Sequence, residues 1–249
     1  MQVIKDIFYG KIQDEDRSLD LYIPDAEQFP IFIFFHGGGL VNGNKNGGAR
    51  IFTQLAENGI AVATCNYRMY PAAKYPDFVL DAAASVAWVK NHISEYGKCD
   101  KIFVGGSSAG GYLSMMLCFD PMWLSAHRVK LTDIAGFIHD AGQPTAHFNV
   151  LKERGIDSRR VIIDNSAPLF HIGNGTKYPP MLIIVSDNDM QNRYEQTMLV
   201  MSTLKHFGQG DVATLKLMHG THTEYLKIFN EDGTNVFANL VEEYINAHI

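Results

Sequence analysis

A serine lies within a glycine-rich turn that joins an apolar run to an apolar helical pattern. Residues 104–111 read VGGSSAGG, so Ser108 stands at the centre of a G-x-S-x-G pattern whose glycines are Gly106 and Gly110. Such a pattern places a nucleophile on a strained strand-to-helix turn, where flanking side chains would collide with neighbouring backbone. We therefore interpret Ser108 as a nucleophile, and Ser107, which is out of register, as a turn or capping residue. A phosphate-binding loop is disfavoured, because no Lys-Ser/Thr pair follows.

A second glycine cluster follows a separate apolar run. His36 is followed directly by three consecutive glycines, residues 37–39. Glycines leave backbone N–H groups unhindered, and such donors can stabilise the negative charge that develops on a carbonyl oxygen under attack. We expect the N–H groups of Gly38, Gly39 and Ala109 to form this oxyanion hole. His36 is expected to brace the loop by hydrogen bonding.

These two motifs, with the segment between them, resemble a known family. Residues 66–71 read NYRMYP and are followed by Tyr75-Pro76 and Asp81. The chain is similar to α/β-hydrolases of the hormone-sensitive-lipase-like esterase group, which is related to acetyl esterases and kynurenine formamidases. Two features depart from the group: Leu40 replaces an aromatic residue that often follows the glycines, and almost no sequence precedes the first strand to form the family's N-terminal cap. The resemblance therefore leaves the acyl-chain preference poorly constrained.

An acid and a histidine must follow the nucleophile in that order, each just after a late strand, because strand ends at one edge of the sheet surround such a site. Asp187 and Asp189 both follow an apolar run, and the resemblance favours Asp189, the third residue after a small one. His219 and His222 follow the last run, and the family's turn corresponds to His222. Asp187 and His219 remain the alternatives.

The same four side chains could in principle supply ligands to Zn²⁺, because histidine and aspartate are common zinc ligands. The sequence contains no H-E-x-x-H helix and no cysteine cluster, and a metal site would leave the serine motif unexplained. We therefore expect no metal and no cofactor.

The elements that would position these residues alternate along the chain. Eight short apolar runs predict strands, at 3–9, 19–23, 31–35, 60–66, 101–104, 134–138, 181–185 and 213–218. Helical patterns lie mostly between the later runs, at 50–58, 78–92, 109–119, 192–206 and 235–247. This order predicts an α/β-hydrolase fold: a doubly wound, mostly parallel, eight-stranded sheet whose first two strands form an antiparallel edge. Residues 1–249 are expected to form a single domain.

A long segment between the sixth and seventh strands, residues 141–178, interrupts this alternation. Long insertions after a strand often build a functional rim or lid, and we expect a cap-like insertion here. His139, Asp140 and Phe148 bracket its start and are candidates to face the pocket. Because residues 152–160 are rich in charge and offer no apolar trough, short acyl chains are expected.

Composition excludes several other classes of protein. The 249 residues carry a formal net charge of −6, which gives no electrostatic reason to bind nucleic acid. No apolar run approaches the roughly 20 residues of a membrane span, and the N-terminus does not read as a signal peptide. The three cysteines are odd in number and widely spaced, which suits reduced thiols. We expect a cytoplasmic protein, free of membrane and nucleic-acid partners, that could form a homodimer.

The sequence thus predicts a serine hydrolase that cleaves small, short-acyl carboxylic esters through an acyl-enzyme. In this hypothesis Ser108 attacks, His222 transfers the proton and Asp189 orients the imidazole. An amidase or formamidase would use the same residues, and the sequence does not separate these reactions. A ligand-binding protein derived from a hydrolase is a further alternative.

Overall fold

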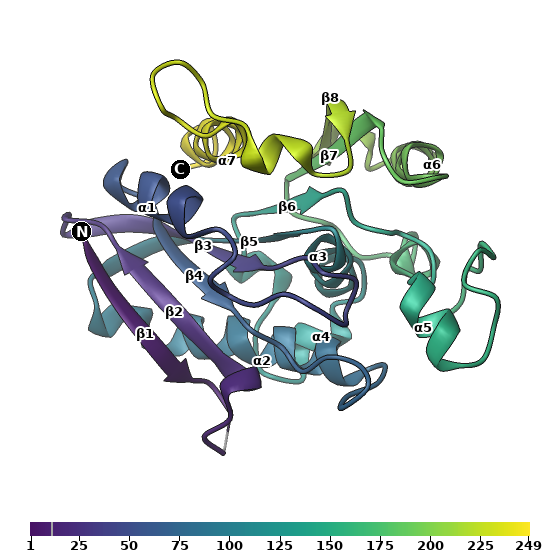
Figure 1. Ribbon diagram of the computed structural model, residues 1–249, viewed down its shortest axis with the longest axis horizontal. Helices are drawn as coiled ribbons and strands as arrows, with labels where there is room; N and C mark the ends of the chain where they lie inside the picture. Colours follow the sequence, from purple (N-terminus) through teal and green to yellow (C-terminus); the bar gives the residue numbers. More distant parts are fainter. Residues whose placement is uncertain (11) are drawn as a thin grey trace.

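A computed structural model describes residues 1–10 and 12–249 and contains one eight-stranded sheet with the order β1-β2-β4-β3-β5-β6-β7-β8 (Figure 1). All eight expected strands are present: β1 Gln2–Phe8, β2 Ser18–Ile23, β3 Gln28–Phe35, β4 Ala61–Cys65, β5 Lys98–Ser107, β6 Gly136–Asp140, β7 Met181–Asn188 and β8 Ala213–Thr221. β1 and β2 run antiparallel at one end of the sheet, and the strands from β4 to β8 are parallel. The predicted α/β-hydrolase sheet is therefore confirmed.

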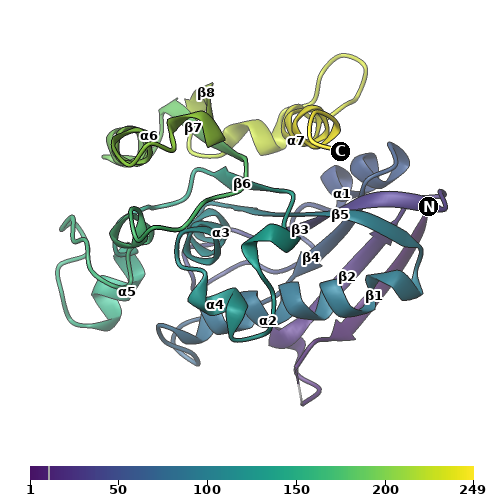
Figure 2. The same ribbon diagram turned by 180° about the vertical axis from the view of Figure 1, so that it is seen from behind.

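Helices cover both faces of the sheet because its central strands are apolar on both faces. Alternate side chains of β3 enter opposite cores: Ile31, Ile33 and Phe35 pack with α2 and α3, whereas Phe32 and Phe34 pack with α1 and α7. Figure 2, seen from behind, shows α2 and α4 together on the first of these faces. The helices are α1 Ala49–Glu57, α2 Asp77–His92, α3 Ala109–Phe119, α4 Met122–Ser125, α5 Phe148–Glu153, α6 Arg193–His206 and α7 Val236–Asn246.

Two helices, α4 and α5, have no counterpart among the expected ones. They are four and six residues long, too short for a helical period to stand out in the sequence. Among the described residues, no helix is long and apolar enough to cross a membrane.

The segment 141–178, where a cap-like insertion was expected, has a buried part and an exposed part. Residues 141–147 are all buried. The charged stretch 152–160 is largely exposed, on and beyond α5. Figure 1 shows α5 to one side of the sheet, below α6. The segment therefore forms a flank of the molecule as well as part of its core.

The carboxyl ends of the parallel strands meet at one edge of the sheet, as expected for ligand-binding edges of open α/β sheets. β3 leads into the glycine cluster at 37–39, β5 into Ser108, β7 into Asp189 and β8 into His222. Residues separated by more than 180 positions in the sequence therefore come together there.

Candidate active site

Ser108 occupies a strained turn between β5 and α3. Its φ of 56° lies in the left-handed region, and its N–H donates to the main-chain oxygen of Asp140 at 2.7 Å. A Cβ atom on Gly110 would lie 1.9 Å from the carbonyl oxygen of Phe35, and one on Gly106 would lie 2.6 Å from the same oxygen. Both positions of the G-x-S-x-G pattern therefore require glycine.

Ser107 does not cap the helix. It is the last residue of β5, because that strand continues three residues beyond the end predicted from its apolar run. The expected turn or capping role is therefore wrong, since the turn begins at Ser108.

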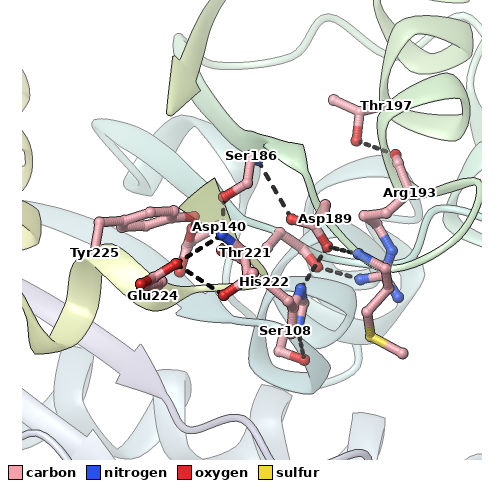
Figure 3. Close-up of polar contacts among 12 residues, drawn as sticks. Ser108, Asp140, Ser186, Asp189, Arg193, Thr197, Thr221, His222, Glu224 and Tyr225 are labelled. Atoms are coloured by element: carbon pink, nitrogen blue, oxygen red, sulfur yellow. Dashed lines mark hydrogen bonds and ion pairs between the residues drawn. The ribbon is translucent and has the colours of Figure 1, made fainter. Parts of the chain in front are cut away.

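Ser108, His222 and Asp189 form one hydrogen-bonded chain (Figure 3). The Nε2 atom of His222 lies 2.8 Å from Ser108 Oγ, and its Nδ1 atom lies 2.6 Å from Asp189 Oδ1. The Asp189 side chain is fully buried, whereas His222 is 22% exposed toward the cavity. This arrangement can pass a proton from the serine hydroxyl to an imidazole that a carboxylate orients.

The two alternative residues form a separate pair at the surface. Asp187 lies within β7, which extends to Asn188, and its carboxylate is 2.6 Å from Nδ1 of His219. The side chains are 40% and 93% exposed, respectively. In this structure His222, and not His219, is the histidine bonded to Ser108.

Hydrogen bonds keep the Asp189 carboxyl group ionised. Burial acts to raise its pKa, but the hydrogen bond and charge of His222 and the N–H groups of Met190 and Ser186 outweigh this, so the pKa is lowered. The N–H of Met190 lies 2.7 Å from Oδ1, and that of Ser186 lies 3.3 Å from Oδ2. Asp189 is therefore ionised at neutral pH and can stabilise a protonated imidazole.

Gly38 and Gly39 lie beside Ser108 with their backbone in conformations that favour glycine. Their φ angles are 114° and 67°, and a Cβ atom on Gly38 would lie 1.8 Å from the carbonyl oxygen of Asn42. Among the described residues, no acceptor takes the N–H of Gly38, Gly39 or Ala109. Ala109 is buried as the first residue of α3, where the helix leaves its N–H unpaired. These three groups are available to a ligand oxygen.

His36 braces the glycine loop. Its Nδ1 atom lies 2.7 Å from the carbonyl oxygen of Gly37, and its ring stacks on Tyr67 with centroids 4.4 Å apart. The Tyr67 hydroxyl donates to the main-chain oxygen of His36 at 2.8 Å. Burial lowers the pKa of His36 to about 4, so its ring is neutral and Nδ1 donates to Gly37.

A cavity of about 590 Å³ opens at Ser108 and His222. Its apolar wall is formed by Phe34, Ile51, Phe52 and Leu226. The segment 141–178 contributes Phe148 and Asn149, and none of the charged residues at 152–160 lines this cavity. The charged stretch, on and beyond α5, therefore contributes no side chain to the wall of this cavity.

The chain is similar in sequence to known ester hydrolases. The BD-FAE family model matches residues 19–123, which include both glycine motifs and Ser108. Over 122 residues the chain is 38% identical to "Probable carboxylic ester hydrolase LipM" of Mycobacterium tuberculosis, a match that covers 47% of this chain and 28% of LipM. It is 28% identical to "Probable carboxylesterase 7" of Arabidopsis thaliana, over 98% of this chain and 87% of that protein.

Solved esterase structures share this fold over almost the whole chain. The chain superimposes on esterase B from Lactobacillus rhamnosis, inhibited with a C4-C4 tributyrin phosphonate, with a TM-score of 0.80 and 19% identity, over 98% of this chain and 84% of that one. The chain therefore has the α/β-hydrolase fold and is similar in sequence to carboxylic ester hydrolases. It matches less than a third of the length of LipM, so the similarity to that relative concerns one part of it.

Four buried polar residues lie near the triad, and the sequence pointed to only two of them. Asp140 and His139 were expected to face the pocket, but both are fully buried, and His139 instead pairs with Ser114 Oγ at 2.8 Å. Arg193 and Tyr225 had no signal in the sequence, since their contacts to this region span more than 50 residues.

The described residues offer no cluster of ligands for the zinc alternative. Within residues 1–10 and 12–249, no three His, Cys, Asp or Glu side chains are grouped so that they could hold a metal ion. His219 and His222 each pair with a different aspartate instead.

Proposed function

We propose that this protein is a serine carboxylesterase that cleaves small, short-acyl esters through an acyl-enzyme. The observation that carries the proposal is the hydrogen-bonded chain from Ser108 through His222 to Asp189, which lies beside free N–H groups of the glycine loop. Together these groups supply a nucleophile, a base, an orienting acid and donors for an oxyanion.

In the first step, Ser108 Oγ attacks the ester carbonyl carbon while His222 Nε2 accepts the hydroxyl proton. The carbonyl oxygen becomes an oxyanion that accepts hydrogen bonds from Gly38, Gly39 and Ala109, each worth about 3 kcal/mol where water is excluded. The imidazolium then gives its proton to the leaving alkoxide as the carbon–oxygen bond breaks. An alcohol departs, and the acyl group remains on Ser108.

In the second step, water replaces the alcohol. His222 accepts a proton from the water as its oxygen attacks the acyl carbon, and the same N–H groups stabilise the second oxyanion. The imidazolium returns the proton to Ser108 Oγ as the acyl bond breaks. The carboxylic acid leaves and the free enzyme is restored.

A preference for short acyl groups is supported by the enclosing wall of the cavity. Phe34 and Phe52 pack against each other with ring centroids 5.3 Å apart, which limits how far a chain can extend between them. The esterase B neighbour was solved with a C4-C4 tributyrin phosphonate, a reagent that carries four-carbon groups. These observations favour acetyl to butyryl esters.

We expect p-nitrophenyl acetate and butyrate to be hydrolysed with at least tenfold higher kcat/KM than the laurate ester, since a pocket that excludes extra methylenes discriminates by about 1–3 kcal/mol. Initial rates with the three esters test this. Phe52→Ala should reduce the difference in kcat/KM between the short esters and the laurate ester, because it lengthens the pocket. Faster turnover of laurate by the unmodified enzyme would show that the acyl pocket is a long one.

A fluorophosphonate probe tests the reaction class directly, because it reacts with a serine whose hydroxyl is activated by a base. We expect one adduct, located on Ser108 by mass mapping, and none in Ser108→Ala. Ser107→Ala, in which the neighbouring hydroxyl is lost, should still be labelled on Ser108. A folded protein that resists the probe would instead support the ligand-binding alternative.

A further inference from the structure

Asp140 lies between the turn that carries Ser108 and the segment that carries His222. It is the last residue of β6 and fully buried, and its main-chain oxygen accepts the N–H of Ser108 at 2.7 Å. Its Oδ1 atom accepts a hydrogen bond from the hydroxyl of Tyr225, which is also buried and lies three residues after His222 (Figure 3). One residue therefore contacts both the turn that carries the nucleophile and the segment that carries the base.

The histidine segment is anchored without this carboxylate. Ser186 Oγ donates to the main-chain oxygen of Thr221 at 3.0 Å, and Thr221 donates its own N–H to Glu224 at 2.8 Å. Tyr225 needs an acceptor, but a neutral amide oxygen would serve. Because burial of a carboxylate is costly, a charge at position 140 requires a further explanation.

The buried charges around His222 suggest that explanation. Two buried carboxylates, Asp140 and Asp189, lie near His222 together with the guanidinium of Arg193, which is buried and donates to the main-chain oxygen of Ala141 (Figure 3). With a neutral imidazole this group of charges carries one excess negative charge. When His222 accepts the serine proton, two positive charges balance the two carboxylates.

We propose that Asp140 is a positioning residue whose buried carboxylate, held by Tyr225, stabilises the His222 imidazolium during proton transfer from Ser108. The inference rests on the proposed serine mechanism, because the imidazolium arises in that reaction. Asp140 touches no reacting atom and acts through His222. It thus supplements Asp189, which contacts the ring directly.

The titration of Asp140 is consistent with this role. Burial raises its pKa to about 6, while the hydroxyls of Ser107 and Tyr225 and the imidazole of His222 limit the rise and Asp189 adds to it. In the described structure Oδ2 has no hydrogen-bond partner. Burial lowers the pKa of Arg193 to about 10, while the charges of Asp189 and Asp140 act to raise it, so its guanidinium stays charged. Asp140 is therefore ionised above about pH 6 and supports the imidazolium there.

The experiment compares Asp140→Asn with the unmodified protein by NMR titration of the His222 imidazole, assigned by its loss in His222→Ala. We expect the protonation midpoint to fall by about 0.5 to 1 pH unit, because a neighbouring negative charge has been removed. The acid limb of kcat/KM should move to lower pH by the same amount, and kcat should fall about tenfold. Asp187→Asn, in which an exposed carboxylate is lost, should leave the His222 midpoint unchanged.

Tyr225→Phe provides a second variant should Asp140→Asn fail to fold. It removes the donor that favours the ionised carboxyl, so the His222 midpoint should move in the same direction. A His222 midpoint that stays in place in the folded variants would overturn the proposal, even if activity falls, because the role would then be structural. The NMR readout needs no turnover, so an absence of ester hydrolysis would count against the proposed function alone.

Discussion

Asp189→Asn is expected to lower kcat for ester hydrolysis about 10⁴-fold, with a much smaller change in KM. The amide would hold the imidazole of His222 in the wrong tautomer, because its NH₂ group donates where Oδ1 now accepts from Nδ1. It would also fail to stabilise the imidazolium formed when Ser108 loses its proton. Steady-state kinetics with p-nitrophenyl acetate measures both parameters.

Asp187→Asn is the matched control for this change. It lies two residues earlier and also pairs with a histidine, but that histidine is His219, which is almost fully exposed. We expect kcat within about twofold of the unmodified enzyme, as for most substitutions at exposed positions. If Asp187→Asn were the crippled variant, the acid would lie on β7 itself and the geometry described for Asp189 would not be the working one.

The sequence predicted the sheet well because the signals are local. Residues 31–35 are apolar without alternation, and that pattern requires a strand covered on both faces. The turn at Ser108 is equally local: the contact of Gly110 with Phe35 excludes any side chain there, and the glycine is visible in the sequence. The position of the serine therefore followed from a few adjacent residues.

The choice of Asp189 over Asp187 was harder, because both were expected after the same apolar run. Spacing alone did not show that β7 continues to Asn188, which keeps Asp187 on the strand and places Asp189 just beyond it. A resemblance to a family turn favoured Asp189 at the sequence level. Burial separates the two carboxylates in the structure, and burial depends on packing that a single sequence does not display.

Long-range contacts were not predictable from the sequence. The hydrogen bond from Tyr225 to Asp140 joins residues 85 positions apart, and no local pattern marks it. The wall of the cavity is similarly hidden, because Phe34 and Phe52 resemble ordinary core residues of a strand and a helix. The charged stretch at 152–160 is conspicuous in the sequence, but it does not line this cavity.

Ser108→Ala is expected to have the largest effect, about a 10⁶-fold loss of kcat, because removal of the nucleophile leaves only binding and the oxyanion donors. The fold should persist, since alanine is no larger than serine and the strained φ of 56° is already imposed by the turn. Thermal unfolding of the variant checks this. A midpoint close to that of the unmodified protein separates lost chemistry from lost structure.

His222→Ala should approach the same background rate, because a serine without its base is a weak nucleophile. The double variant Ser108→Ala/His222→Ala should be no slower than either single variant, since residues that act as one unit give non-additive losses. His219→Ala serves as the control and should retain most activity, because its ring bonds to Asp187 at the surface. If the two losses multiplied in the double variant, Ser108 and His222 would be acting independently. That result would contradict proton transfer between them, which their 2.8 Å contact supports.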